Sequence, residues 1–202
     1  MSQPAADPPG PRHRGRPRSQ DSRNAVLAAV VELLGRGGFD QLSMDAIAAR
    51  AAVSKATIYR WWPNKVALVV EAIDETVEEV VTARDTGSLD GDVAWVMSGF
   101  LAALNAPEGR LVEALAAASQ HHEDLHQALE ERFLARRRDL VVGILERASA
   151  RGELRDGVDH ALVADVVVAV LFYRIRLRPP SVDSAVVEGL IRLLVDGLRR
   201  QP

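Results

Sequence analysis

The sequence contains no cysteine, and this absence removes several classes of function. Without thiols the chain has no disulfide scaffold, no thiolate metal site and no cysteine nucleophile. It also has no long hydrophobic run. The longest, residues 166–173, has eight residues, whereas a membrane-spanning helix needs about 18 or more. Because the N-terminus is polar and lacks an apolar signal core, we expect a soluble cytoplasmic protein with no membrane partner.

Signatures of common enzymes are absent as well. The chain has no G-x-S-x-G motif, no glycine-rich phosphate loop and no Ser/His/Asp set that its spacing would assemble. His122 and His126, with His121 beside them, have the i,i+4 spacing that can place two imidazoles on one metal ion. A third ligand has no obvious position, and the neighbouring acidic residues are typical of a solvated helix start. We expect no catalytic residue, no metal site and no cofactor.

The residues that are present predict a helical globular protein. Of the 202 residues, 48% are hydrophobic and 26% are charged, as in ordinary proteins of one or two domains. Apolar residues recur at spacings of three and four, and no segment alternates with period two. This pattern predicts an all-α fold of about nine helices. The later helices are predicted at 92–105, 109–121, 124–150, 159–177 and 182–200.

Charge is divided unevenly along the chain. Residues 1–65 hold ten Lys/Arg against five Asp/Glu, whereas residues 66–202 hold fifteen against twenty-three. The formal net charge of −3 therefore hides a basic N-terminal third. Such asymmetry indicates a nucleic-acid-binding end on an acidic body, although a basic tail without a partner would give the same count. Four of the nine aromatic residues fall within residues 39–62, which favours the first alternative.

Residues 1–20 are predicted to form a disordered basic arm. They hold five of the ten prolines and no aliphatic side chain larger than alanine after Met1, so they cannot bury enough apolar surface to fold. Arg14, Arg16 and Arg18 resemble the core of an AT-hook, an extended segment that lays arginines in a narrow A·T minor groove. A flexible tail with only non-specific attraction to DNA is the alternative.

Residues 21–65 are predicted to form three helices of a small N-terminal domain. The first ends at Gly37-Gly38, because glycine accepts the positive φ that stops a helix. Ser43 and Ser54 are suitable N-caps for a second and a third short helix, with only about three residues between those helices. Asn64 is expected to cap a long fourth helix.

The two short helices and their tight turn predict a helix-turn-helix, whose second helix enters the DNA major groove by its N-terminal end. Free N–H groups and the helix dipole at that end favour phosphate. Ser54, Lys55 and Thr57 add short or cationic donors there. Tyr59 adds a hydroxyl, and Lys65 adds a second charge directed at phosphate. Other helical hairpins can mimic this pattern.

Residues 26–73 carry a more specific signal. It consists of a Gly-Phe turn, Ser43, Ile47-Ala48, Val53-Ser54, Thr57-Ile58-Tyr59, an aromatic pair and Asn64-Lys65. At this spacing the segment closely resembles the DNA-binding region of the TetR/AcrR family of bacterial regulators. The resemblance implies that residues 66–202 form a larger helical domain for ligand sensing and dimerisation. Ala52 departs from the family, because many members have glycine in that turn and alanine tolerates positive φ poorly.

The resemblance also implies roles for individual residues. Thr57, Tyr59 and Lys65 would contact phosphates, while Lys55 and Ala56 would lie against base edges. The small core of the motif would be Leu42, Ile47, Val53 and Ile58. The complete set of expected DNA-binding residues is Ser43, Met44, Ser54, Lys55, Ala56, Thr57, Tyr59, Arg60, Trp61 and Lys65.

The last two predicted helices indicate a subunit interface. Residues 159–177 are apolar nearly all round the helix, and a helix apolar on every side is buried on every side. A small chain has little interior to cover both this helix and residues 182–200, although core packing accounts for part of each. In the resembled family these two helices pair across a two-fold axis as a four-helix bundle. The expected interface residues are Leu162, Val166, Val170, Val187, Leu190 and Leu194.

The segment between the DNA-binding domain and these helices is the expected sensor. Its sparse large side chains are candidates for lining a ligand cavity, and each is alternatively plain core. These candidates are Trp95, Met97, Phe100, Phe133, Phe172 and Tyr173.

Together these features predict a ligand-responsive transcriptional repressor. It would bind a pseudo-palindromic operator in double-stranded DNA as a homodimer and respond to an unknown small-molecule effector. The alternative is a small-molecule-binding or enzymatic helical protein whose basic N-terminal segment is incidental.

Overall fold

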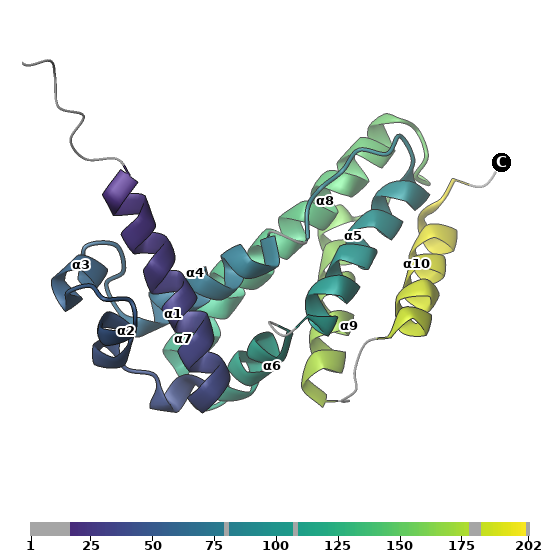
Figure 1. Ribbon diagram of the computed structural model, residues 1–202. Helices are drawn as coiled ribbons and strands as arrows, with labels where there is room; N and C mark the ends of the chain where they lie inside the picture. The colour runs from purple at the N-terminus through teal and green to yellow at the C-terminus, as the bar shows by residue number, and fades with distance from the viewer. Residues whose placement is uncertain (1–16, 79–80, 107–108, 178–182, 201–202) are drawn as a thin grey trace, which may run out of the picture.

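The computed structural model describes residues 17–78, 81–106, 109–177 and 183–200 (Figure 1). In these segments the chain is helical, with no β-strand and one isolated bridge between Leu154 and Arg199. Three consecutive elements, α7 (Glu123–Ala128), a π-helical turn η1 (Leu129–Leu134) and α8 (Ala135–Ala150), follow one another without a break and count as one, so these segments contain nine helices. The predicted all-α fold of about nine helices is confirmed.

Three helices form the N-terminal part of the molecule, at the left of Figure 1. They are α1 (Pro17–Gln41), α2 (Met44–Arg50) and α3 (Lys55–Tyr59). α1 is broken at Gly38, whose φ of 71° lies in the left-handed region that glycine adopts without strain. The break coincides with the glycine pair that predicts it. The helical turn that follows folds back, so that Phe39 is buried.

The beginning of α1 corrects the prediction for the N-terminal arm. α1 starts at Pro17, so the prediction of disorder over residues 1–20 was wrong for residues 17–20. Proline fits the first position of a helix because the N–H it lacks would have no intrahelical partner. Arg18 therefore lies on helical backbone and not in an extended AT-hook core. Residues 1–16, with Arg14 and Arg16, lie outside the described residues.

Longer helices make up the rest of the chain. They are α4 (Lys65–Glu78), α5 (Leu89–Asn105), α6 (Gly109–Ala118), α7 (Glu123–Ala128), η1 (Leu129–Leu134), α8 (Ala135–Ala150), α9 (His160–Leu177) and α10 (Ser184–Leu198). Asn64 caps α4 as predicted, because its side-chain oxygen accepts a hydrogen bond from the N–H of Ala67 at 2.8 Å. Each of the five later helices predicted from periodicity is present, with ends that differ by a few residues.

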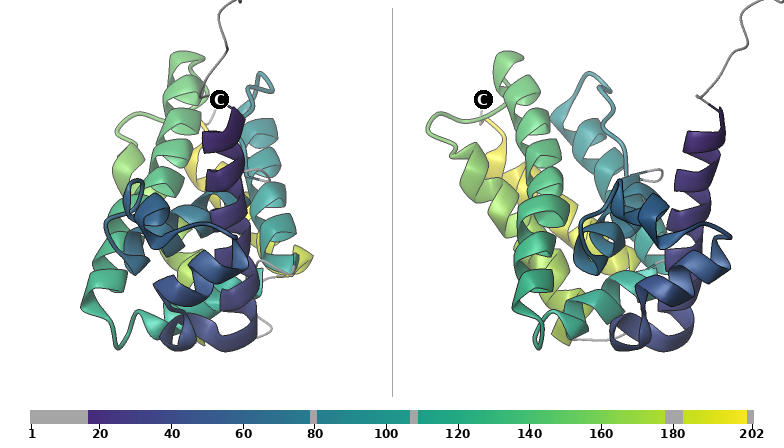
Figure 2. Two further views of the ribbon diagram at one scale, coloured as in Figure 1. Left: turned by 60° about the vertical axis from the view of Figure 1, so that its left-hand side comes forward. Right: turned by 90° about the vertical axis from the view of Figure 1, so that its left-hand side faces the viewer.

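The packing of these helices joins the two parts of the molecule. α1 packs against both α4 and α6, while α9 packs along α8 and α10 along α5 (Figures 1 and 2). The buried residues form one continuous hydrophobic cluster that extends from α1 to α10. The small N-terminal part therefore rests directly on the helices of the C-terminal part.

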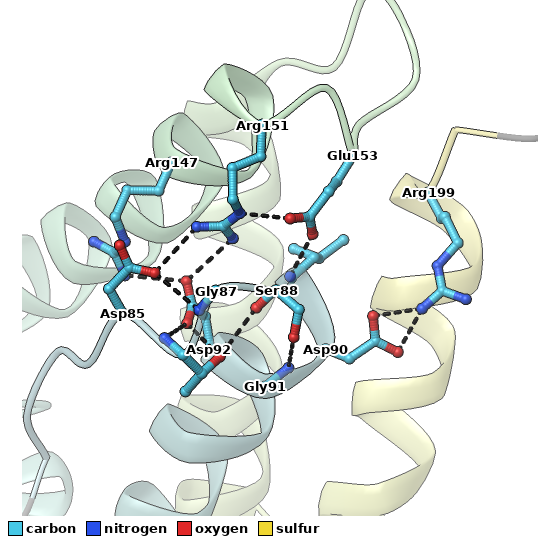
Figure 3. A network of polar contacts seen from close by, with 12 residues as sticks. Asp85, Gly87, Ser88, Asp90, Gly91, Asp92, Arg147, Arg151, Glu153 and Arg199 are labelled. Atoms are coloured by element: carbon cyan, nitrogen blue, oxygen red, sulfur yellow. Dashed lines mark hydrogen bonds and ion pairs between the residues drawn. The ribbon is translucent and has the colours of Figure 1, made fainter.

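A buried carboxylate holds the turn between α4 and α5. Asp92 accepts hydrogen bonds from the backbone N–H and the hydroxyl of Thr86, at 2.6 and 2.7 Å. Arg147 of α8 and Arg151, which directly follows α8, approach its other oxygen at 3.4 Å (Figure 3). Burial alone raises the pKa of Asp92, but the hydrogen bonds and the two arginines outweigh it and lower that pKa. The start of α5 is thereby fixed to the end of α8.

The same network reaches the C-terminal end of the described chain. Glu153, just after α8, accepts hydrogen bonds from the N–H of Leu89 and from Nε of Arg151, both at 2.5 Å (Figure 3). Arg199, which follows α10, forms an ion pair with Asp90 in the first turn of α5. Three helix ends therefore meet in one polar cluster.

Candidate DNA-binding interface and ligand cavity

The helix-turn-helix consists of two capped helices and a strained turn. The hydroxyl of Ser43 accepts a hydrogen bond from the N–H of Ala46 at 3.2 Å, and the hydroxyl of Ser54 accepts one from the N–H of Thr57 at 3.1 Å. Both predicted N-caps are thus confirmed. Ala52 lies in the turn with a φ of 53°, a conformation that costs a residue with a Cβ about 1–2 kcal/mol. The strain expected from alanine at this position is present.

α3 presents an accessible polar face. Lys55, Ala56 and Arg60 are exposed, Tyr59 is 50% exposed, and Thr57 is partly accessible. These side chains offer a cation, hydroxyls and a guanidinium, the donor types that contact phosphate oxygens and base edges in DNA. The face is therefore chemically suited to the major groove.

Two lysines of the predicted interface already have partners within the chain. Nζ of Lys55 lies 2.8 Å from Oδ1 of Asp45 in α2, and this hydrogen bond raises the pKa of Lys55. Nζ of Lys65 donates to the carbonyl oxygen of Phe39 at 3.0 Å and lies 4.0 Å from the centroid of its ring. Lys65 thus joins the turn after Gly38 to the start of α4. Neither contact was predicted from the sequence.

The remaining predicted DNA-binding residues lie next to this face. Trp61 packs edge-on against Trp62, with ring centroids 5.4 Å apart, and carries the guanidinium of Arg60 over its ring at 5.1 Å. Ser43 is exposed and Met44 is half-buried at the start of α2. All ten predicted residues therefore lie on α2, α3 or the adjacent segments, and each keeps some surface accessible.

Behind the interface, the predicted core and a set of ion pairs fix its position. Leu42, Ile47 and Ile58 are buried as expected, while Val53 is half-buried. Glu32 of α1 pairs with Arg50 at the end of α2, which ties the motif to α1.

A second set of ion pairs ties α1 to α4. Arg23 pairs with both Glu71 and Glu75, and the hydrogen bond to Glu75, together with the one to Glu71, raises the pKa of Arg23 against a smaller opposing effect of burial. These ion pairs hold α1 against the middle of α4.

A cavity of about 60 Å³ lies in the C-terminal part, bordered by α4, α5, α6, η1, α8 and α9. Three of the predicted ligand-binding residues, Phe100, Phe133 and Phe172, line it. Met97 lines a separate space of about 20 Å³ between α5, α8, α9 and α10. The cavity also has one charged lining residue, Arg137, which sequence reasoning missed.

Two other predicted cavity residues lie on the surface. Trp95 and Tyr173 are 42% and 51% exposed and line neither of these spaces. Trp95 instead packs under the guanidinium of Arg84, 4.7 Å from its ring centroid. The prediction that these two side chains line a cavity was wrong. The size of a side chain does not tell which face of its helix packs against the rest of the protein.

The predicted interface residues of the last two helices separate into two groups. Leu162 and Val166 of α9 are 59% and 41% exposed, and Val170 is half-buried. Val187, Leu190 and Leu194 of α10 are buried within the subunit, where α10 packs against α5. As interface residues these three were predicted wrongly, because they belong to the core. The large apolar side chain that α10 exposes is that of Leu193, at 68%.

The histidine cluster has a structural contact. Nε2 of His122 lies 2.7 Å from Oδ1 of Asp40, and its ring meets that of Phe39 edge-on with centroids 5.0 Å apart. Among the described residues, no group of three or more histidines and carboxylates is arranged to hold a metal ion. Within the same segments, every helix is too short or too polar to cross a membrane.

Comparisons with known families cover both parts of the chain. Residues 26–72 match the family described as bacterial regulatory proteins, tetR family. Residues 83–194 match the family described as tetracyclin repressor-like, C-terminal domain.

Individual relatives match along most of their length. The HTH-type transcriptional regulator YdeS of Bacillus subtilis is 34% identical over 92% of this chain and 94% of its own. The DNA-binding transcriptional repressor TetR of Mycobacteroides abscessus is 35% identical over 86% of this chain and 92% of its own. The crystal structure of TetR family transcription regulator SCO0332 superposes with a TM-score of 0.74, with 33% identity over 90% of this chain and 100% of that one.

Proposed function

The chain belongs to the TetR family of bacterial transcriptional regulators, and we propose that it represses transcription as a homodimer on a pseudo-palindromic operator. A small molecule in the C-terminal domain would shift the dimer to a state whose recognition helices no longer match the two half-sites. Membership of a family of transcriptional regulators supports this function over the alternative of a small-molecule-binding or enzymatic helical protein whose basic N-terminal segment is incidental.

The accessible face of α3 is the observation that supports this function most directly. Lys55, Ala56, Tyr59 and Arg60 stand at the surface on a short helix that is held by its cap and by the core behind it. We assign Lys55 and Ala56 to base edges, and Thr57, Tyr59 and Lys65 to phosphates. Phosphate contacts fix the register of a protein on DNA, whereas base contacts select the sequence.

Dimerisation is supported by apolar surface on the last two helices. Leu162, Val166 and Tyr173 recur along one side of α9, and Leu193 is the corresponding large exposed residue of α10. Isolated apolar side chains are common on surfaces, but several on two adjacent helices mark an interaction surface. An isologous contact through these helices would place two copies of α3 for a symmetric operator.

The direction of regulation is inferred from a relative. The protein of Mycobacteroides abscessus that is 35% identical to this chain is named a transcriptional repressor. We propose the same direction here, with the cytoplasm as the place of action because the operator is there.

Selection of genomic DNA fragments by the purified protein tests this function. We expect the protein to enrich a palindromic sequence and to retard it in a gel shift that weakens as salt rises, because phosphate contacts release counterions. Retention of all fragments alike, or of none, would contradict the proposal. The genes beside the enriched site should be expressed more strongly in a strain that lacks the protein.

A further inference from the structure

The cavity in the C-terminal part presents almost only hydrocarbon to its interior. Its lining consists of aliphatic and aromatic side chains from five helices and the π-helical turn, and among the described residues Arg137 of α8 is its single charged one. The exposed wall is nevertheless almost wholly apolar. The lining residues that keep some solvent exposure, Leu104, Leu134 and Phe172, are apolar as well. A molecule in this space would therefore meet apolar atoms both inside the cavity and at the edge nearest the solvent.

The charge of Arg137 is paired outside the cavity. Its Nη1 donates to the carboxylate of Asp74 and, at 3.0 Å, to the carbonyl oxygen of Phe133. Arg137 also borders a separate polar space beside Asp74, Arg136 and Asp139, and Asp74 lines that space and not the cavity. Because the cavity wall is almost wholly apolar, the guanidinium adds next to no polar surface to it. Arg137 therefore separates the apolar cavity from the polar space.

This arrangement selects against polar ligands. A polar group that leaves water without gaining a hydrogen bond loses free energy, and a charged group loses far more. Many ligand pockets place a few polar groups on an apolar wall to receive such groups, but the surface of this wall offers almost none. Phe100, Phe133 and Phe172 instead offer three rings, which pack favourably against another ring. Burial of apolar surface is then what holds a ligand in this cavity.

We propose that this cavity binds a small uncharged hydrophobic molecule that lacks hydrogen-bonding groups. The size of the space sets the size of this molecule. A water-sized group needs about 10–15 Å³ of such volume, so a cavity of about 60 Å³ accepts about four to six non-hydrogen atoms. A single six-membered ring, as in benzene, or a short hydrocarbon chain fits this range.

The position of α6 gives the site a consequence for DNA binding, which rests on the proposed function. Val112 lines the cavity from α6, and Leu111 beside it is buried where α6 packs against α1. The two helices approach closely there, because a Cβ on Gly35 of α1 would lie 3.4 Å from Cδ2 of Leu111. α1 is tied in turn to the helix-turn-helix by the pair between Glu32 and Arg50. A ligand beside Val112 would therefore shift the surface on which α1 rests.

Calorimetric titration of the full-length protein with benzene, pyridine and butyrate tests the chemistry of the site. The three probes have the same number of non-hydrogen atoms, but pyridine adds one hydrogen-bond acceptor and butyrate adds a negative charge. We expect benzene to bind about tenfold or more tightly than pyridine, because the acceptor of pyridine would be buried without a donor, and butyrate to bind least. Equal or tighter binding of pyridine or butyrate, or no binding of benzene, would overturn the proposal.

A variant that fills the cavity locates the binding. Ala103 of α5 lines the cavity and is buried, whereas Ala102 beside it is exposed. Ala103→Leu puts an isobutyl group into the space and should weaken benzene binding about tenfold or more, because less apolar surface of the ligand can then be buried. Ala102→Leu, the same change on the solvent side of the helix, should bind benzene as the parent protein does. Benzene binding that Ala103→Leu leaves unchanged would contradict the assignment.

A variant that widens the cavity decides the question if Ala103→Leu does not fold. Val112→Ala removes two methyl groups from the wall that α6 contributes. Ethylbenzene should bind to this variant about fourfold or more tightly than to the parent protein, because each buried methylene adds a factor of about four in affinity. An affinity for ethylbenzene that Val112→Ala leaves unchanged would mean that the ligand does not occupy this cavity.

A gel shift on the same samples separates this inference from the proposed function. Release of the operator when benzene is added to the parent protein, but not when it is added to Ala103→Leu, supports both. Benzene binding without release of the operator keeps the site and overturns its link to DNA through α6. Intact operator binding by a protein that takes up none of the probes overturns the apolar site alone. Failure of the ligand-free protein to bind any operator overturns the proposed function and leaves the calorimetric result to decide the site.

Discussion

The ammonium of Lys55, at the start of the recognition helix, lies 2.8 Å from the carboxylate of Asp45 in the preceding helix. Both side chains are more than half exposed, and the hydrogen bond between them raises the pKa of Lys55. The cation assigned to base edges is therefore paired within the protein before DNA arrives. When the protein binds DNA, Lys55 must give up the carboxylate of Asp45 for an acceptor on a base. Asp45 and the DNA therefore compete for the same ammonium group.

Removal of the Asp45 carboxylate should accordingly increase the affinity of the protein for DNA. We expect Asp45→Asn to tighten operator binding by about two- to fivefold, because exposed ion pairs contribute little and a negative charge near phosphate is also lost. Asp156→Asn, an exposed aspartate before α9, is the matched control and should have no effect. Titration of a labelled operator at one salt concentration measures both, and weaker binding by Asp45→Asn would show that Asp45 orients Lys55 for the DNA.

The two lysines should differ in what they contribute. Lys65→Ala should weaken binding to all sequences and reduce the slope of log affinity against log salt by about 0.9 per lost phosphate contact. It should also lower the melting temperature, because Lys65 holds the carbonyl of Phe39. Lys55→Ala should instead change the preferred bases in a selection from random DNA. A loss of sequence preference in Lys65→Ala, without one in Lys55→Ala, would reverse the assigned roles.

The turn of the helix-turn-helix offers a stabilising substitution. Ala52 has a φ of 53°, so Ala52→Gly should raise the free energy of unfolding by about 0.5–1 kcal/mol after the entropic cost of glycine is subtracted. Ala49→Gly, at an exposed position of α2, is the matched control and should lower it by about 1 kcal/mol. Urea titrations of the three proteins measure these values. Equal destabilisation by both substitutions would mean that the turn is not strained.

The apolar surface of α10 predicts the oligomeric state. Leu193→Glu should convert a dimer of twice the 22.0 kDa chain mass into a monomer that stays folded, because Leu193 is 68% exposed in the subunit. Leu190→Ala should leave the dimer intact and cost about 2–5 kcal/mol of stability, because it opens a cavity against α5. Sedimentation at micromolar concentration distinguishes these outcomes, and a monomeric parent protein would contradict the interface.

The basic arm predicts a preference for A·T base pairs that flank the half-sites of the operator. Residues 1–16 carry three arginines against one aspartate and are joined directly to α1, so their effective concentration near bound DNA is high. Deletion of residues 2–16 should leave the dimer unchanged and weaken binding more on operators with A·T flanks than with G·C flanks. Equal weakening on both would mean non-specific attraction, and no weakening would remove the arm from DNA binding.

The periodicity of apolar residues predicted where the helices lie, but it did not predict which helices pack against one another. The caps at Ser43, Ser54 and Asn64 are local features, because the backbone N–H three residues later donates to each capping side chain. The packing partner of α10 is not local. Leu190 and Leu193 have the same chemistry, yet one packs on α5 and the other faces outward, and only the tertiary arrangement decides between them.

The polar contacts between distant helices were beyond the reach of sequence reasoning. Arg137 stands in a run of three arginines, and it alone lies four residues after Phe133 and four before Val141, in register with the buried side of the helix. That spacing could have marked it as the arginine that faces the core. Its partner, Asp74, lies 63 positions earlier in the chain. A contact across that separation leaves no periodic signal, so the ion pair emerges only from the fold.

The turn after Gly38 is contacted by side chains from two later helices. Lys65 holds the carbonyl of Phe39 at the start of α4, and His122 meets Phe39 and Asp40 from the start of α7. From Asp40 the chain reaches Ser43, the N-cap of α2, within three residues. The start of the helix-turn-helix is therefore fixed to α4 and α7 through this short segment as well as through α1. If the proposed ligand response exists, insertion of residues between Asp40 and Ser43 should weaken it while both parts stay folded.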